Sequence, residues 1–129
     1  MPTVLIVDDC RAVRKMLRAL LEKHLSSVMC TEATNGLEAI AKTEASSPDL
    51  IILDLGMPGM NGFEAATVLQ KIKPQVPLFM FTSHDKHDVE SQAASVGIRA
   101  VFSKYTGINA LLVQVSELLN SCHALTTTA

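Results

Sequence analysis

The 129 residues suffice for one domain with a substantial core, because a chain of this length buries roughly two-thirds of the surface that its unfolded form exposes. A hydrophobic content of 48% excludes an intrinsically disordered chain, and a net charge of −2 without a basic run excludes a surface built to gather nucleic acid or an anionic membrane. No apolar run approaches a membrane span, the opening MPTVLIVDD is too short and too soon acidic for a signal peptide, and three cysteines without CxxC spacing indicate neither a disulfide framework nor a zinc site. We therefore expect a globular cytoplasmic protein.

Strand-like and helix-like patterns alternate along the first half of the chain. Thr3–Val7 is a continuous run of β-branched residues and leucine, which is typical of a strand buried on both faces. Arg11–Leu25 has apolar residues at helical spacing and basic residues on the opposite face. Val28–Ala33 is a weaker strand, which we place at a sheet edge. Asn35 is a candidate N-cap for a short helix. The residues of that helix expected to face inward are Leu37, Ile40 and Ala41.

The second half continues the same alternation. The strands expected here are Leu50–Leu53, Leu78–Phe81 and Ala100–Ser103, and the helices expected are Phe63–Ile72, Lys86–Val96 and Ile108–Leu119. The middle helix has poor helical propensity and should end at Gly97, whereas the last has the best apolar stripe. Five strands joined by helical crossovers predict an α/β fold, with a parallel sheet and helices on both of its faces.

Four of the expected strands end in residues suited to phosphate and a divalent cation. Asp8 and Asp9 follow the first strand, Asp54 the third, Thr82 the fourth and Lys104 the fifth. In an open parallel sheet, ligands bind outside the carboxyl ends of the strands, so these side chains should converge. Each residue alone could be a helix cap or a surface charge. Three carboxylates packed together without a counter-ion cost several kcal/mol, however, so the cluster predicts a magnesium-assisted phosphoryl acceptor.

One known family has this pattern. The receiver domain of bacterial response regulators, and above all its single-domain, chemotaxis-regulator-like form, resembles this chain in Asp8-Asp9, Asp54-Leu55-Gly56-Met57-Pro58, Thr82-Ser83 and Lys104. The likeness spans about Thr3 to Leu119. It implies a doubly wound, flavodoxin-like sheet with strand order 2-1-3-4-5. We expect residues 1–122 to form the receiver domain of a two-component system and residues 123–129 to form a frayed C-terminal tail.

The resemblance also implies a role for each site residue. Asp54 is the residue that becomes aspartyl phosphate, Lys104 holds one phosphoryl oxygen and the Thr82 hydroxyl binds another. The Mg²⁺ ligands that it implies are Asp9, Asp54 and the Gly56 carbonyl, with Asp8 acting mainly through water. Oxygen ligands of this kind suit Mg²⁺, which often bridges carboxylates and phosphates. We further hypothesise that His84 and Gly56 set the lifetime of the phosphorylated state.

The resemblance implies a signalling module that catalyses only its own phosphorylation and dephosphorylation and is not an enzyme for an external metabolite. The phosphoryl donor would be a histidine kinase or a histidine phosphotransfer protein. An unknown output protein would bind the face formed by Lys86–Val96, Arg99–Phe102 and Ile108–Leu119, which phosphorylation would shift between two arrangements. No direct contact with nucleic acid or a membrane is expected.

Two features depart from the family pattern. Tyr105 replaces the usual proline after the lysine, so we expect a trans peptide bond there, because a cis bond before a non-proline residue costs about 3 kcal/mol. Val101 stands where an aromatic switch is common, and strand alternation directs Phe102 to the opposite face. Tyr105 is therefore a candidate substitute for the missing switch.

Two rival functions remain open. A small Mg²⁺-dependent phosphohydrolase would use Asp54 as its nucleophile, but it generally needs a second carboxylate two residues later, where this chain has Gly56. A phosphorylation-independent binding module would keep only the fold. The intact acidic residues, Thr82 and Lys104 argue against that alternative.

Overall fold

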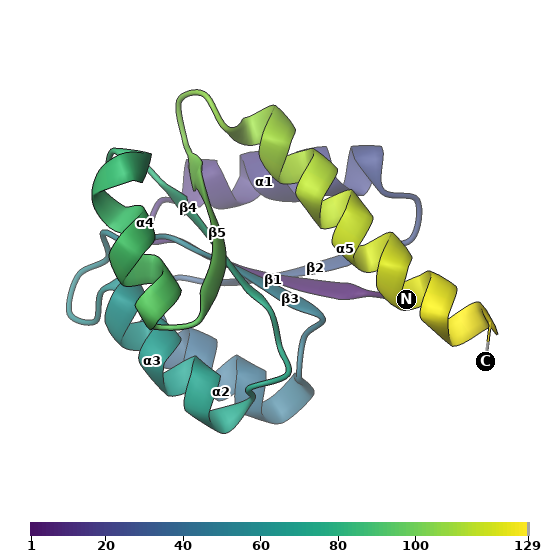
Figure 1. Ribbon diagram of the computed structural model, residues 1–129, viewed down its shortest axis with the longest axis horizontal. Helices are drawn as coiled ribbons and strands as arrows, with labels where there is room; N and C mark the ends of the chain where they lie inside the picture. The colour runs from purple at the N-terminus through teal and green to yellow at the C-terminus, as the bar shows by residue number, and fades with distance from the viewer. Residues whose placement is uncertain (129) are drawn as a thin grey trace.

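The computed structural model describes the backbone of residues 1–128 and the side chains of residues 1–120. Strands and helices alternate along the chain (Figure 1) in the order β1 (Thr3–Val7), α1 (Arg11–His24), β2 (Met29–Ala33), α2 (Gly36–Ser46), β3 (Leu50–Leu53), α3 (Gly62–Ile72), β4 (Leu78–Thr82), α4 (Lys86–Ser95), β5 (Ile98–Ser103) and α5 (Ile108–Thr128). The predicted tail, residues 123–129, lies outside the residues whose side chains are described.

The five strands form one parallel sheet in the order β2-β1-β3-β4-β5, which confirms the predicted topology and the edge position of β2. Val7 at the end of β1 pairs with Ala33 at the end of β2 and with Leu53 at the end of β3. The carboxyl ends of these strands are therefore level, and the residues that follow them share one edge of the sheet.

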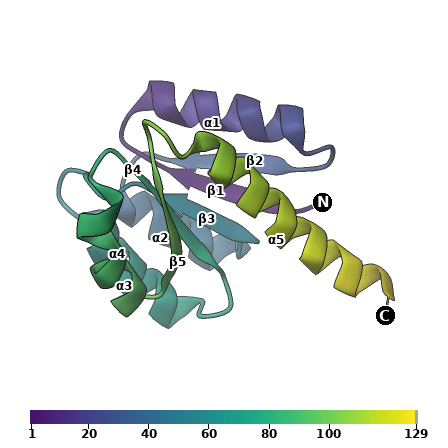
Figure 2. The same cartoon turned by 45° about the horizontal axis from the view of Figure 1, so that its top comes forward.

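Helices cover both faces of the sheet, as predicted: α1 and α5 lie on one face and α2, α3 and α4 on the other (Figures 1 and 2). The central strands are buried on both sides because their side chains alternate between two apolar clusters. Val4 and Ile6 pack with Leu17 and Leu111 on the α1/α5 side. On the opposite side, Leu5 belongs to the cluster that contains the buried residues of α2, α3 and α4.

The buried face of α2 differs from the predicted one. Leu37 is 70% exposed and Ala41 is exposed, whereas Ile40 is half-buried. The buried face consists instead of Gly36, Ala39 and Thr43, which are small residues at helical spacing. Small side chains are required there because α2 packs closely on the loop before α3. A Cβ on Gly36 would lie 2.7 Å from the sulfur of Met60.

The helix α4 has few buried residues, in agreement with its poor sequence pattern. Only Val89 and Ala93 of its ten residues are buried. The helix gives way to β5 at Gly97, whose φ of +89° is a conformation that side-chain-bearing residues rarely adopt. Few buried contacts make α4 an element that a small free energy can shift.

Candidate functional site

Backbone hydrogen bonds extend the sheet by one residue beyond its strands and set the site residues side by side. The Asp8 amide donates to the Ala33 carbonyl at 3.1 Å, and the Asp54 amide donates to the Val7 carbonyl at 2.9 Å. Between β4 and β5, the Lys104 amide donates to the Thr82 carbonyl at 2.8 Å. Main-chain hydrogen bonds alone therefore place Asp8, Asp54 and Lys104 directly after the ends of their strands.

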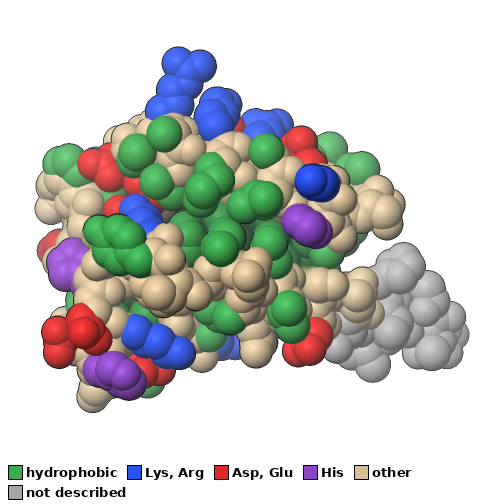
Figure 3. Space-filling view, turned by 90° about the horizontal axis from the view of Figure 1, so that it is seen from above, with side chains coloured by type: hydrophobic (Ala, Val, Ile, Leu, Met, Phe, Trp, Pro, Cys, Tyr) green, Lys and Arg blue, Asp and Glu red, His purple; other side chains and the backbone are tan. Residues whose placement is uncertain are grey.

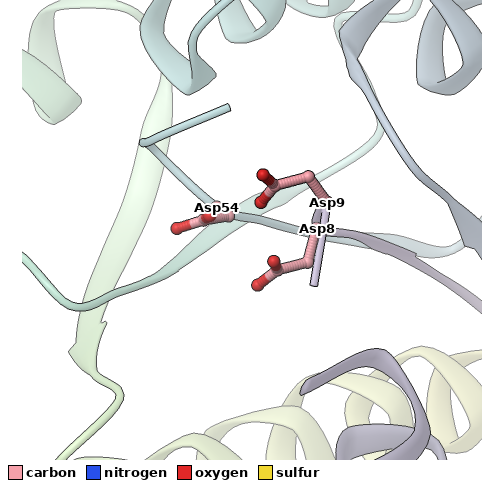
Figure 4. Close-up of side chains that lie close together, drawn as sticks. All are labelled: Asp8, Asp9 and Asp54. Carbon is pink, nitrogen blue, oxygen red and sulfur yellow. The ribbon is translucent and has the colours of Figure 1, made fainter. Parts of the chain in front are cut away.

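The three predicted carboxylates converge. Asp8, Asp9 and Asp54 each offer a carboxylate oxygen, and these oxygens lie within 4.8 Å of one another (Figure 4). Asp8 is 2% exposed and Asp54 is 6% exposed, whereas Asp9 is open to solvent. Clustered carboxylates with one open side form an oxygen donor set that could bind a hard divalent cation.

Lys104 reaches into this cluster from β5. Its Nζ lies 2.8 Å from Asp8 Oδ2 and 3.4 Å from Asp54 Oδ1. Burial by itself would lower the pKa of Lys104, but the hydrogen bond to Asp8 and the charge of Asp54 raise it above the ordinary value, so the group is a cation. Burial and the neighbouring charge of Asp8 raise the pKa of Asp54 despite the attraction of Lys104. One ammonium group thus does not compensate the carboxylates.

Thr82, at the end of β4, is fully buried, and its hydroxyl is bonded to His84. The hydroxyl accepts a hydrogen bond from the His84 amide at 3.1 Å and lies 3.2 Å from the imidazole Nδ1. The imidazole in turn borders Gly56, since a Cβ on Gly56 would lie 3.4 Å from His84 Cε1. His84 and Gly56, singled out from the sequence, are therefore neighbours in space.

Gly62 is a site residue that the sequence analysis missed. Its amide donates to the Leu55 carbonyl at 2.8 Å, and a Cβ on it would lie 2.3 Å from the Asp54 carbonyl oxygen. Only glycine lets the start of α3 approach the backbone of Asp54 so closely. The available signal was its position directly after Asn61, which caps α3 through a capping box with Glu64.

Arg14 is a second residue that the sequence analysis misplaced. The basic residues of α1 were expected on the solvent face, but Arg14 is 8% exposed. It lies three residues before Leu17 and seven before Leu21, and it shares their buried side of the helix. Helical spacing therefore indicated that Arg14 is buried, but its charge led us to place it on the solvent face.

The two departures from the family pattern take the expected form. The Lys104–Tyr105 peptide bond is trans. Val101 belongs to the cluster under α2, α3 and α4, and Phe102 belongs to the one under α1 and α5, which confirms that they face opposite sides of the sheet. Tyr105 is 79% exposed. Its role as a substitute switch stays a prediction.

The fold is that of a receiver domain. Residues 4–116 match the family described as the response regulator receiver domain, and the chain belongs to that family. It is similar to protein PilH of Pseudomonas aeruginosa, with 31% identity over 92% of this chain and 98% of PilH. Among solved structures it is similar to chemotaxis protein CheY4 of Vibrio cholerae, with a TM-score of 0.81 and 28% identity over 92% of this chain and 98% of that one. It is thus a CheY-like signalling module of the two-component type.

Other curated relatives are longer than this chain. The protein-glutamate methylesterase/protein-glutamine glutaminase of Pyrococcus abyssi is 34% identical over 76% of this chain, which spans only 26% of that protein. The chain likewise spans 57% of a putative transcriptional regulator of Pseudomonas aeruginosa. Among the described residues, no helix combines the length and the apolar character that crossing a membrane would require.

Proposed function

We propose that the protein accepts a phosphoryl group on Asp54, with Mg²⁺ as cofactor, from a histidine kinase or a histidine phosphotransfer protein. The observation that carries the proposal is the position of Lys104, whose Nζ lies between Asp8 and Asp54 beside a cluster of three carboxylates. Receiver domains as a family act with such phosphodonors. The same likeness supports a cytoplasmic location.

The donor set of the site suits Mg²⁺. Asp9 and Asp54 would bind the ion directly with the Gly56 carbonyl, and Asp8 would act mainly through water. All of these donors are oxygen atoms, the ligand type that Mg²⁺ prefers. Bound there, the ion would supply positive charge that offsets the repulsion between a carboxylate and a phosphoryl group.

The protein's own groups account for the rest of the transfer. A carboxylate oxygen of Asp54 forms the new bond to phosphorus, and the bond from phosphorus to the donor imidazole nitrogen breaks. Lys104 offers its ammonium group to one phosphoryl oxygen. The Thr82 hydroxyl gives up its hydrogen bond with His84 and binds a second phosphoryl oxygen instead. His84 and Gly56 border the path by which water approaches the phosphoryl group, so they set its lifetime.

The output surface consists of α4, β5 and the exposed side of α5. A groove runs along this face, lined in part by His84, Arg99 and Tyr105. Thr82 and His84 lie in the segment of chain just before α4. A change in the hydrogen bond of the Thr82 hydroxyl would therefore affect the start of α4, which belongs to this surface. We propose that phosphorylation shifts α4 and thereby regulates a partner protein.

The decisive experiment is incubation of the protein with Mg²⁺ and acetyl phosphate, followed by intact-protein mass spectrometry. The expected result is the gain of one phosphoryl group, which is lost in Asp54→Asn and in the presence of a chelator. Ser83→Ala, which changes an exposed neighbour of Thr82, serves as a matched control and should still be phosphorylated. Multiple turnover of the donor would favour the phosphohydrolase, and no phosphoryl gain would favour a binding module.

A further inference from the structure

Arg14 is a buried cation outside the site described above. Among the described residues, the buried polar or charged side chains are Asp8, Arg14, Thr43, Asp54 and Thr82. Three of these five form the candidate site. A buried guanidinium is costly unless its donors are satisfied, so its partners identify what it does.

The partners of Arg14 lie just past the end of β1 and on β2. Its Nη1 donates to the backbone carbonyl of Asp8 at 2.7 Å, and its Nε donates to Glu32 Oε1 at 3.0 Å. Lys15 and Arg18 also bind Glu32, each at 2.9 Å. Glu32 therefore compensates the charge of Arg14 and anchors its planar fork at the edge strand β2.

The Asp8 carbonyl is a special acceptor because it lies past the end of the strand pairing. β1 is paired up to Val7, and its neighbours end at Ala33 and Leu53. The Asp8 amide still bonds to the Ala33 carbonyl, but the Asp8 carbonyl bonds to the Arg14 side chain. The peptide unit is planar, so fixing this oxygen also fixes the Asp9 nitrogen and both flanking Cα atoms. Fixing that plane restricts the positions from which the Asp8 and Asp9 side chains start, and so restricts where their carboxylates can lie.

We propose that Arg14 is a positioning residue for the metal site: its guanidinium holds the Asp8–Asp9 peptide in the orientation that presents both carboxylates to the cation. The inference rests on the proposed function, because it assigns Arg14 a role in the same Mg²⁺ site. Arg14 does not itself touch the ion. Mutation of a residue that hydrogen-bonds a metal ligand typically weakens metal binding by roughly 10–100-fold. We expect Mg²⁺ affinity to fall by about tenfold, because only one hydrogen bond to the peptide is removed.

The test compares Mg²⁺ affinity, measured by isothermal titration calorimetry, in Arg14→Lys and Arg14→Met. Lysine keeps the charge but has no planar fork to hold both acceptors, so both variants should bind Mg²⁺ about tenfold more weakly. The matched control is Arg18→Met, which removes another partner of the same Glu32 from the same helix without touching β1. Figure 3 shows several Lys and Arg side chains along the edge of the molecule where α1 lies. Arg18→Met therefore removes one cation from a surface that keeps others. The control should keep wild-type affinity.

A second readout uses the metal-free protein. The Cys10 amide donates to Asp8 Oδ1 at 2.9 Å, and this bond depends on the direction of the Asp8 side chain. Hydrogen exchange of the Cys10 amide, followed by NMR, should accelerate in both Arg14 variants and not in Arg18→Met. If one Arg14 variant does not fold, the other supplies the comparison.

The outcomes separate the two proposals. Wild-type Mg²⁺ affinity in a folded Arg14 variant would overturn the positioning role and leave the proposed function intact. An equal loss of affinity in Arg14→Met and Arg18→Met would also overturn it, because the effect would then belong to Glu32. If the unmodified protein binds no Mg²⁺, the proposed function fails and the positioning role fails with it.

Discussion

At the scale of single residues, the acidic site carries an excess of negative charge. Asp8, Asp9 and Asp54 outnumber the one ammonium group of Lys104. The raised pKa of Asp54 records the same imbalance, since burial and the charge of Asp8 outweigh the attraction of Lys104. A divalent cation would relieve this repulsion, and a phosphoryl group would in turn need the cation.

The position of His84 leads to a prediction about the lifetime of the phosphorylated state. The His84 imidazole borders Gly56, which has no side chain to block the approach of water. Replacing His84 with alanine should open the approach and accelerate dephosphorylation several-fold. The measurement is the decay of radiolabelled phosphoprotein after removal of the donor.

His87→Ala is the matched control for this prediction. Its side chain is 90% exposed, so its removal should leave the decay rate unchanged. An unaltered dephosphorylation rate in His84→Ala would show that the imidazole does not control the lifetime of the phosphoryl group.

Thr43 supports a prediction about stability. Its hydroxyl is fully buried on the inner face of α2 and has no hydrogen-bond partner among the described residues. Replacing it with valine keeps the branched shape and removes the unsatisfied oxygen, so Thr43→Val should raise the free energy of unfolding by about 1 kcal/mol. Urea denaturation of both proteins measures the difference.

The control is the same substitution on a neighbouring helix. Thr67 is exposed on α3, where its hydroxyl donates to the Phe63 carbonyl at 2.9 Å. Helix propensity changes equally at both positions, so the two substitutions differ in the burial and in the hydrogen bonding of the hydroxyl that is removed. A gain in Thr67→Val as large as that in Thr43→Val would contradict the explanation.

At the scale of elements, the strand ends could be predicted from the sequence, whereas the burial of Arg14 in α1 and the inward face of α2 could not. Continuous apolar runs leave no choice of buried face, so Asp8, Asp54 and Lys104 were placed by their position after each run. In a helix the face depends on phase. Arg14 is buried because acceptors on Asp8, just after β1, and on Glu32 in β2 satisfy its donors. Leu37 is exposed because the tight packing of Gly36 selects another face of α2. Such partners belong to other segments of the chain and become visible only in the fold.

The network that joins α1 to β2 leads to a prediction about pH. Burial alone would raise the pKa of Glu32, but hydrogen bonds from Lys15, Arg18 and Arg14 lower it from 4.5 to about 2. Because the pKa of the folded state is depressed, the network stabilises the protein fully above about pH 4.5, and this stability is lost as the pH falls toward about 2.

Glu32→Gln should therefore flatten the acid side of the stability profile. The wild type should lose about 1–2 kcal/mol more than the variant over this range, after allowance for solvent screening at the half-exposed Lys15 and Arg18. Thermal unfolding followed by circular dichroism at a series of pH values measures both profiles. Parallel profiles would mean that Glu32 is not the group that titrates.

At the scale of the whole molecule, a short path joins the candidate site to the proposed output surface. The Thr82 hydroxyl is bonded to His84, and Asp85, the next residue, caps α4 by accepting a hydrogen bond from the His87 amide at 2.8 Å. Since α4 is held by only two buried side chains, it can respond to a change at Thr82 at low cost. The helix α2 lies on the same side of the sheet but follows the edge strand β2, which β1 and β3 separate from β4.

Hydrogen exchange with mass spectrometry tests this path across the entire chain. Adding Mg²⁺ and beryllofluoride, which mimics the phosphoryl group, should change the exchange of peptides from α4 and β5 and leave peptides from α2 near their original rates. The same addition to Asp54→Asn should change neither. Because the Thr82 hydroxyl connects the two regions, Thr82→Val should still bind the mimic but lose the response in α4. A response in α4 that persists in Thr82→Val would require a different route through the sheet.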